Sequence, residues 1–257
     1  HVTAGGRYTK DKRNGALTKV QNRVANFPFV FDKGRFDPMV TLAFDAADGV
    51  NLYAKYSTGY RAGGANSRSQ TFNPFNPEVV KAWEAGAKLE MFDRRVRLNL
   101  AAYMMDRTGT QIDFDNVDTN PTSPTFNLHT EETANAPGKS RIRGAEAELT
   151  VRPIENMTVG ASYAYTYTKV PDTLNPFLST PTTPVYTKVF VVYTPRNAAS
   201  GYVDYEIPVG NAGAKVKLHV DGNYSSSAYS FQNEDVKNEA NFIVNGRIAL
   251  ADLSVSD

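Results

Sequence analysis

The sequence has no cysteine, which excludes both a disulfide framework and a thiolate metal site. It also lacks long apolar runs. The longest, such as Val189–Tyr193, are only a few residues long, far short of the roughly 20 apolar residues that a spanning helix needs. The mean hydropathy of −0.43 is likewise too polar for a helical membrane protein. The 28 basic and 27 acidic residues leave a net charge of +1, with no clustered basic face to indicate a nucleic-acid partner.

Histidine is scarce, and the three histidines, His1, His129 and His219, are scattered along the chain. None adjoins a turn that could present a nucleophile, so the sequence does not predict an enzyme, a catalytic residue, a cofactor or a metal site. Glu146 and Glu148 share one face of a strand, but they could serve as acid and base only in a pocket that perturbs them. We interpret them as partners of Arg or Lys, either from neighbouring strands or from a plug, which is a separate domain enclosed by the strands.

Aromatic residues are abundant for so polar a chain, with 14 Tyr and 14 Phe, and apolar and polar residues alternate in segment after segment. In residues 50–60, for example, Leu52 and Tyr56 fall on one face while Asn51 and Lys55 fall on the other. A period of two is typical of a strand whose two faces meet different solvents. When repeated around the chain, this pattern predicts an all-β fold, an antiparallel transmembrane β-barrel with lipid outside and water inside.

About ten strands are expected from this alternation. They lie near residues 2–10, 36–46, 50–61, 80–92, 95–107, 140–152, 157–169, 196–207, 215–228 and 240–252. The apolar positions of each strand, among them Leu52, Leu89, Leu98 and Val220, are expected to face lipid. The lumen is expected to be lined by polar positions on the other face, namely Lys55, Glu84, Lys88, Glu90, Glu146, Glu148, Lys217, His219 and Asp221.

Short turns and long loops alternate between the predicted strands. The short turns are Ala47-Asp48-Gly49, Asp93-Arg94, Pro153–Asn156 and Gly210–Gly213. The long connections are about 25 residues between the first two strands, then loops near 62–79, 108–139, 170–195 and 229–239, which we interpret as irregular. Tight turns at one end and long loops at the other are typical of outer-membrane barrels, whose loops are extracellular and whose turns are periplasmic.

The longest loop carries the candidate ligand contacts. An acidic run with one aromatic ring, Asp113, Phe114, Asp115 and Asp118, precedes His129 in this loop. Such a run could meet a cationic or sugar ligand, and the alternative is an ordinary polar extracellular loop. Spacing alone does not decide between the two. By contrast, Gly59–Gly64 lacks the Lys-Ser/Thr of a phosphate-binding loop, so we interpret it as a flexible exit from a strand.

Several motifs resemble successive barrel segments of TonB-dependent outer-membrane receptors. Leu52-Tyr53-Ala54-Lys55-Tyr56-Ser57-Thr58-Gly59-Tyr60-Arg61-Ala62-Gly63-Gly64 carries the most specific resemblance. It is followed in the family's order by Asn73–Glu78, Trp83–Lys88, Asn99 to Tyr103 with Gln111, Gly144–Glu148 and Thr194–Asn197, and is preceded by Ala4–Thr9. Each motif alone is a weak signal, but the motifs follow one another in the family's order along essentially the whole chain.

This resemblance implies a roughly 22-stranded barrel that encloses a plug domain. It also implies energised uptake of a scarce nutrient across the bacterial outer membrane, driven by the TonB–ExbB–ExbD complex acting through the plug. The expected partners are therefore that complex, outer-membrane lipid and a small-molecule nutrient: a siderophore–iron complex, vitamin B12 or an oligosaccharide. No plug or TonB box is visible, and the ending Leu253–Asp257 resembles a turn cut before its return strand. Residues 1–257 are thus expected to form an incomplete barrel domain.

Two other classes stay open on the sequence alone. A passive outer-membrane porin would keep the barrel and need no energised step. A soluble all-β adhesion or carbohydrate-binding protein would instead bury the apolar face in a packed interior. The position of Leu52, Leu89, Leu98 and Val220 separates the membrane reading from the soluble one.

Overall fold

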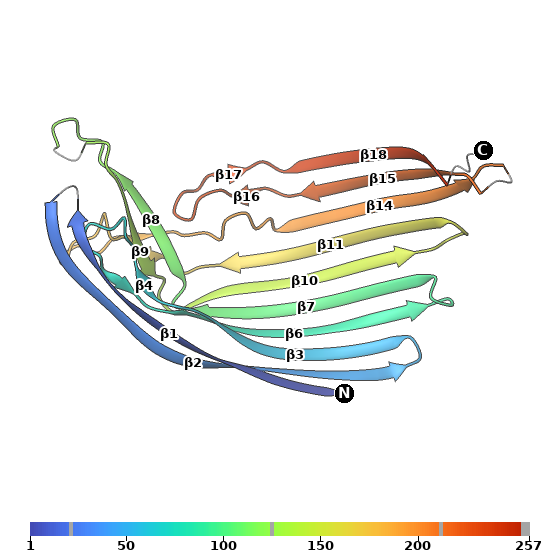
Figure 1. The fold of residues 1–257 in the computed structure, drawn as a ribbon, viewed down its shortest axis with the longest axis horizontal. Helices are drawn as coiled ribbons and strands as arrows, with labels where there is room; N and C mark the ends of the chain where they lie inside the picture. Colours follow the sequence, from blue (N-terminus) through green and yellow to red (C-terminus); the bar gives the residue numbers. More distant parts are fainter. Residues whose placement is uncertain (21–22, 124–125, 211–212, 253–257) are drawn as a thin grey trace, which may run out of the picture.

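The computed structural model describes residues 1–20, 23–123, 126–210 and 213–252, with Arg23 described by its backbone alone. Ten long strands form one antiparallel sheet (Figure 1). In both chain and sheet order they are β1 (Val2–Val20), β2 (Arg23–Ala47), β3 (Val50–Arg61), β6 (Glu78–Met91), β7 (Val96–Thr108), β10 (Lys139–Val151), β11 (Met157–Lys169), β14 (Asn197–Pro208), β15 (Lys215–Ser225) and β18 (Asn241–Ala251).

Each strand of the sheet pairs with the long strand that follows it in the chain, so the topology is an up-and-down meander. This confirms the predicted all-β antiparallel class and its ten strands. Strands β1 and β18 are the two edges of the sheet. No helix in the described part of the chain is long and apolar enough to cross a membrane.

The pairing register divides the sheet into an apolar face and a polar face. Leu52, Ala87 and Leu100 lie opposite one another on β3, β6 and β7, and the neighbouring positions Asn51, Lys88 and Asn99 form the adjacent row on the other face. Leu52 and Val220 are 42% and 54% exposed, and Leu89 and Leu98 are paired but not buried. The apolar face is therefore not covered by a protein interior, as the membrane reading predicts.

Packing is concentrated in the loops and not beneath the sheet. The buried hydrophobic residues of the described chain are Phe31, Ile112, Phe114, Ala136, Val170, Val189 and Phe190. All except Phe31 lie between the long strands, in the connections that follow β7 and β11. The sheet thus leaves one face bare while the loops build the only packed core among the described residues.

Residues with positive φ form two of the predicted turns. Asp48 and Gly49 join β2 to β3, and Gly49 has a φ of 71°, a left-handed conformation that glycine adopts without a steric penalty. Between β6 and β7, Phe92, Asp93 and Arg94 all have positive φ, from 53° to 64°. The predicted turn at Gly210–Gly213 lies partly outside the described residues, as residues 211 and 212 are not described, and so does the ending 253–257.

The predicted loop of about 25 residues between the first two strands is wrong. The β1–β2 hairpin is paired from Val2 with Leu42 to Val20 with Arg23, with one irregularity between Leu17 and Lys19. The far half of this hairpin carries polar residues on both faces, as where Lys10 forms an ion pair with Asp32. Apolar residues such as Phe29 and Val30 also occur on both faces, so the segment lacks the regular alternation by which strands are recognised in sequence.

The long loops are also less irregular than predicted. Each contains a short hairpin: β4 (Gly64–Ala65) with β5 (Pro74–Phe75), β8 (Gln111–Val117) with β9 (His129–Asn135), β12 (Thr173–Leu174) with β13 (Tyr186–Thr187), and β16 (Ala228–Tyr229) with β17 (Lys237–Asn238). In the longest loop, the β8–β9 hairpin pairs seven residues on each side. Residues 124–125 of that loop lie outside the described part.

Candidate functional site

The four long loops contact one another at one end of the sheet. We call the described residues of 62–77, 109–138, 170–196 and 226–240 the loop cluster. Arg13, on the polar face of β1, donates from Nη1 to the carbonyl oxygen of Gly63 at 3.2 Å. The hydroxyls of Thr110 and Ser140 lie 2.7 Å apart, which ties the start of the longest loop to β10. Figure 1 shows the β1–β2 hairpin rising beside β4, β8 and β9 at this end of the sheet.

An apolar core holds the loop cluster together. Ile112 and Phe114 of β8 pack with Ala136, and residues from the next long loop, Val170 and Val189, complete the core. Phe114 is fully buried, with 0% of its surface exposed. Burying a side chain of this size stabilises a fold by about 1.5–3 kcal/mol. The longest loop is therefore packed against its neighbour and does not project freely into solvent.

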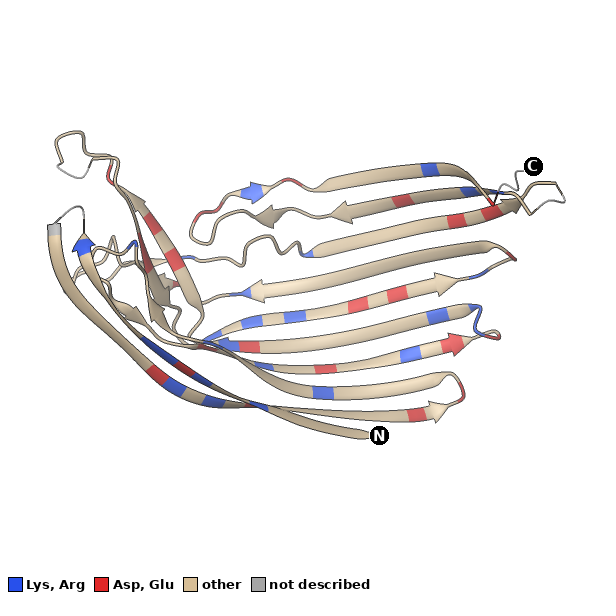
Figure 2. Ribbon diagram, in the orientation of Figure 1, with Lys and Arg blue, Asp and Glu red and all other residues tan. Residues whose placement is uncertain are grey.

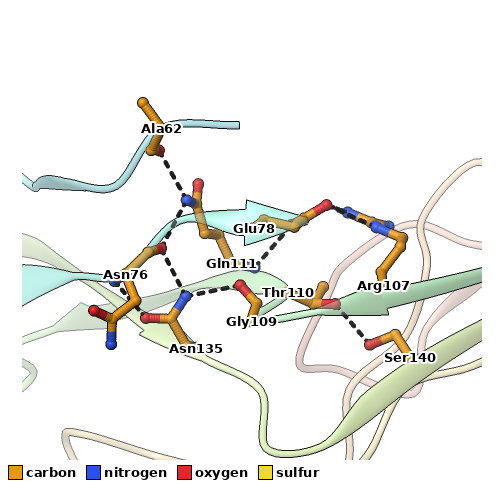
Figure 3. A network of polar contacts seen from close by, with 9 residues as sticks. All are labelled: Ala62, Asn76, Glu78, Arg107, Gly109, Thr110, Gln111, Asn135 and Ser140. Atoms are coloured by element: carbon orange, nitrogen blue, oxygen red, sulfur yellow. Dashed lines mark hydrogen bonds and ion pairs between the residues drawn. The ribbon is translucent and has the colours of Figure 1, made fainter. Parts of the chain in front are cut away.

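A buried carboxylate lies at the base of the longest loop (Figure 3). Glu78, at the start of β6, accepts a hydrogen bond from Arg107 Nε at 2.7 Å and forms an ion pair with the guanidinium. Its second oxygen accepts the backbone N–H of Gln111 at 3.0 Å. The Gln111 side chain donates onward to the carbonyl oxygens of Ala62 and Asn76, at 3.0 and 3.1 Å. This network joins the ends of three strands to two loops.

Asn135 closes the same network from the other strand of the β8–β9 hairpin. Its Oδ1 accepts the backbone N–H of Asn76 at 2.7 Å, and its Nδ2 donates to the carbonyl oxygens of Asn76 at 2.9 Å and Gly109 at 2.7 Å (Figure 3). A side-chain amide that pairs both ways with one backbone residue fixes that residue in place. The loop 62–77 is thereby held against the base of the hairpin.

Two further carboxylates on β9 hold the tip of the first long loop. Glu132 is buried and accepts hydrogen bonds from the Ser69 hydroxyl at 2.6 Å, the Gln70 N–H at 3.2 Å and the Thr71 hydroxyl at 3.2 Å. Its neighbour Glu131 forms an ion pair with Arg68. These contacts satisfy charges that would otherwise be costly to bury.

Gln232 connects the last long loop to the others. Its side-chain oxygen accepts the backbone N–H of Asp113 at 3.0 Å, and its carbonyl oxygen accepts the N–H of Phe190 at 2.8 Å. One residue of the loop 226–240 thus bonds to both preceding long loops. The four loops therefore form one connected unit.

The predicted ligand contacts separate into buried and exposed groups. Phe114 is buried in the loop core, and Asp113 is half-buried and accepts the hydroxyl of Thr133 at 2.7 Å. Asp115 and His129 lie diagonally across the β8–β9 hairpin, both exposed, with Oδ1 and Nε2 2.9 Å apart. Asp118 is half-buried and caps the following turn through the N–H of Asn120 at 3.0 Å. The spacing thus unites Asp115 and His129 but turns the Phe114 ring away from the surface.

Strand register places all nine predicted lumen residues on the polar face. Several have polar partners there. Glu84 accepts from the Tyr53 hydroxyl at 2.8 Å, Glu148 accepts from Asn99 at 3.2 Å, Glu90 pairs with Arg97 at 3.1 Å and Lys217 pairs with Glu206 at 3.1 Å. Glu148 is therefore bonded to an amide, where Arg or Lys was expected as its partner.

His219 lies between two carboxylates on the polar face. Its Nδ1 is 2.7 Å from Asp204 and its Nε2 is 3.1 Å from Asp221. With both ring nitrogens engaged, no lone pair is left for a metal. Among the described residues there is no group of three or more His, Asp or Glu side chains that could hold a metal ion.

Acidic and basic residues are distributed unevenly over the loop end of the sheet. Figure 2 shows red segments on the β8–β9 hairpin and a mixture of blue and red on the adjacent β1–β2 hairpin. A group of basic residues, with Lys188 and Lys237 among them, lines a cavity between the loops 170–196 and 226–240. Sequence reasoning missed this cavity. The one available signal was Val189–Tyr193, an apolar run inside an otherwise polar loop, which indicates that the loop is packed.

A curved meander with an uncovered apolar face, tight turns at one end and long folded loops at the other is typical of a transmembrane β-barrel. The chain belongs to the TonB dependent receptor-like, beta-barrel family, whose model matches residues 1–256. The family of the sequence resemblance is thereby confirmed.

Two relatives of this chain are receptors by name. The chain is 28% identical over 221 residues to the ferric-pyoverdine M114 receptor PbuA of Pseudomonas sp. (strain M114), covering 84% of this chain and 24% of that protein. It is 24% identical over 208 residues to the ferrioxamine B receptor of Salmonella typhimurium, covering 81% of this chain and 25% of that protein. The chain thus spans about a quarter of the length of these relatives.

Solved structures show the same fold. The ferric yersiniabactin uptake receptor FyuA from Yersinia pestis aligns with a TM-score of 0.71 at 15% identity, covering 96% of this chain and 35% of that one. The siderophore receptor PiuA from Acinetobacter baumannii aligns with a TM-score of 0.68 at 15% identity, covering 95% of this chain and 33% of that one. At this identity the likeness concerns the fold alone.

Proposed function

We propose that this chain is part of the barrel of a TonB-dependent receptor that takes up a ferric siderophore across the bacterial outer membrane. The observation that carries the proposal is the loop cluster, which is packed and hydrogen-bonded into one unit at one end of the sheet. Ordered loops at the mouth of a barrel can capture a ligand, whereas an open channel has no need for a cluster of this kind.

The relatives support iron among the candidate nutrients. The named receptors act on ferric pyoverdine and ferrioxamine B, and one aligned structure is a ferric yersiniabactin uptake receptor. The proposed uptake requires no covalent bond of the ligand to be made or broken. The polar side chains of this chain accordingly hold loops and line a pore, and none is assigned to catalysis.

The other parts that such uptake requires are assigned to portions of the receptor outside this chain. Residues 1–257 form a barrel segment, and a plug, further strands and contact with the TonB–ExbB–ExbD complex are proposed to come from outside them. The apolar face, with residues such as Leu52 and Val220, meets outer-membrane lipid. The polar face, including Lys55, Glu84 and Glu146, lines the lumen around the plug. Asp115 and His129, exposed at the tip of the β8–β9 hairpin, are retained as candidate ligand contacts.

Uptake of radioactive iron tests this proposal. Cells that express the complete receptor as their sole siderophore receptor are supplied with iron complexes of a pyoverdine, a hydroxamate and a catecholate, with and without a functional TonB protein. We expect accumulation of at least one complex, abolished in cells without TonB. TonB-independent entry of small solutes, without preference for an iron complex, would instead establish a passive porin. Recovery of the receptor from the soluble fraction without detergent would favour the soluble all-β class.

A further inference from the structure

A cavity of about 490 Å³ opens between the loops 170–196 and 226–240, above the loop end of β11. Thr166 and Thr168 of β11 contribute hydroxyl groups to its wall, and Val189 and Phe190 contribute buried apolar surface. A volume of several hundred Å³ with mixed apolar and polar walls is typical of a small-molecule site.

The charges around this cavity are strongly one-sided. Four cationic side chains line it, Lys169, Lys188, Arg196 and Lys237, with a single carboxylate, Asp172. This composition leaves an excess of three positive charges at neutral pH. No ion pair within 4.0 Å joins any of these five side chains to another residue of the described chain. Elsewhere at the loop end of the sheet cations have acidic partners, as Arg68 has Glu131 and Arg107 has Glu78.

Two aromatic rings stand in the middle of this basic group. Phe190 and Tyr229 stack with their centroids 3.7 Å apart and their planes inclined by 17°. Lys188 Nζ lies 5.3 Å from the centroid of Phe190, and Lys237 Nζ lies 4.5 Å from that of Tyr229. Because nothing fits between rings at 3.7 Å, each ammonium group lies over an outer face of the stack. The stack thereby holds two unpaired cations at the cavity.

Backbone hydrogen bonds fix the walls of the cavity. The N–H of Phe190 donates to Gln232 at 2.8 Å, and the N–H of Tyr193 donates to Tyr229 at 2.9 Å. The N–H of Ser226 donates to Asn197 at 2.9 Å at the base of the two loops. A preformed site loses little conformational entropy on binding, so its charges act on a ligand without first being ordered.

We propose that this cavity binds an anionic ligand, such as a ferric complex whose iron is held by catecholates. The unpaired ammonium and guanidinium groups attract its negative charge, and the Phe190–Tyr229 stack holds two of the ammonium groups in place. A neutral or cationic iron complex gains nothing from the charge excess. This inference rests on the proposed function and refines it by giving the sign of the ligand's charge.

Binding of two probes to the purified complete receptor in detergent tests the inference. The anionic probe is the ferric complex of a tris-catecholate chelator, and the comparison probe is a ferric trihydroxamate of similar size with a neutral chelate core. The variant carries Lys188→Gln and Lys237→Gln, which keep a polar side chain and remove two charges. The control carries Lys12→Gln and Lys33→Gln, two exposed lysines on the β1–β2 hairpin.

We expect the unmodified receptor to prefer the catecholate probe, with a dissociation constant that rises with salt. The double variant should bind that probe about tenfold more weakly or worse. The control variant should bind it as tightly as the unmodified receptor does. Equal binding of both probes, binding of neither, or a catecholate affinity untouched by the double variant would each overturn the inference. TonB-dependent uptake of a different iron complex would at the same time leave the proposed function standing, so the two failures are distinguishable.

Discussion

Glu78 and Arg107 form a nearly buried ion pair at the point where β6 and β7 meet the longest loop. Arg107 Nε donates to Glu78 Oε1 at 2.7 Å, and the side chains are 24% and 9% exposed. The other oxygen of Glu78 accepts the N–H of Gln111, the residue at which β8 begins. One carboxylate therefore orients both the strand pair and the hairpin that grows from it.

Replacing Glu78 with Ala should loosen the loop cluster. The change leaves Arg107 and the Gln111 N–H without their acceptor, and removing one partner of a buried ion pair costs about 3–5 kcal/mol. We expect faster hydrogen exchange and faster proteolysis within residues 109–138, while the long strands of the sheet stay protected. Glu155→Ala, in the exposed turn between β10 and β11, is the control. Unchanged protection of the β8–β9 hairpin in Glu78→Ala would refute this role.

Gly160 should not tolerate a side chain while Tyr202 lies over it. A Cβ at Gly160 would come 2.1 Å from Cε1 of Tyr202, and the two residues are directly paired on β11 and β14. We expect Gly160→Ala to lower the unfolding free energy in detergent by about 1–3 kcal/mol, because the ring must be displaced.

A double-mutant cycle identifies the cause. Gly160→Ala combined with Tyr202→Ala should cost less than the sum of the two single changes, because the clash no longer exists in the double variant. Gly15→Ala, where a Cβ would meet nothing within 4 Å, is the matched control and should be close to neutral. Additive costs at Gly160 and Tyr202 would show that the ring does not limit the site.

Leu100 and Asn99 test the two faces of the sheet at adjacent positions. Leu100 is 40% exposed on the apolar face, and Asn99 donates to Glu148 at 3.2 Å on the polar face. Leu100→Arg should destabilise the receptor in lipid by about 2–4 kcal/mol, since it places a charge against hydrocarbon. Asn99→Arg, beside Glu148, should be nearly neutral. Urea unfolding in lipid vesicles measures both, and equal costs would contradict the assignment of the faces.

Gly49 and Gly210 separate two costs of replacing a turn glycine. Both have positive φ, 71° and 65°, so Ala is strained at each. Only at Gly49 would the new Cβ also meet backbone, 2.3 Å from the carbonyl oxygen of Glu90. We expect about 1 kcal/mol or more for Gly210→Ala and a clearly larger loss for Gly49→Ala. Thermal unfolding in detergent compares them, and equal losses would mean that the β6 backbone yields without cost.

Much of the sheet could be predicted from the sequence because its signal is local. Alternation in residues 50–61 follows from the backbone of a strand, whose side chains point to opposite faces at successive residues. The same rule placed all nine polar candidates, from Lys55 to Asp221, on one face. The rule failed for residues 11–35, where both faces mix charged and apolar residues and the strands carry no regular alternation.

The sequence by itself determined the strands that carry an apolar face, the tight turns such as Asp48-Gly49, and the class of protein. Only the tertiary structure decided which loop residues meet. Asp113 is bonded to Gln232, 119 residues away, and Phe190 stacks on Tyr229 from another loop. Nothing in the spacing of these residues encodes such contacts, because they depend on the sheet bringing successive loops to the same end. The physical reason is that strand patterning repeats every second residue, whereas loop packing is set by distant partners.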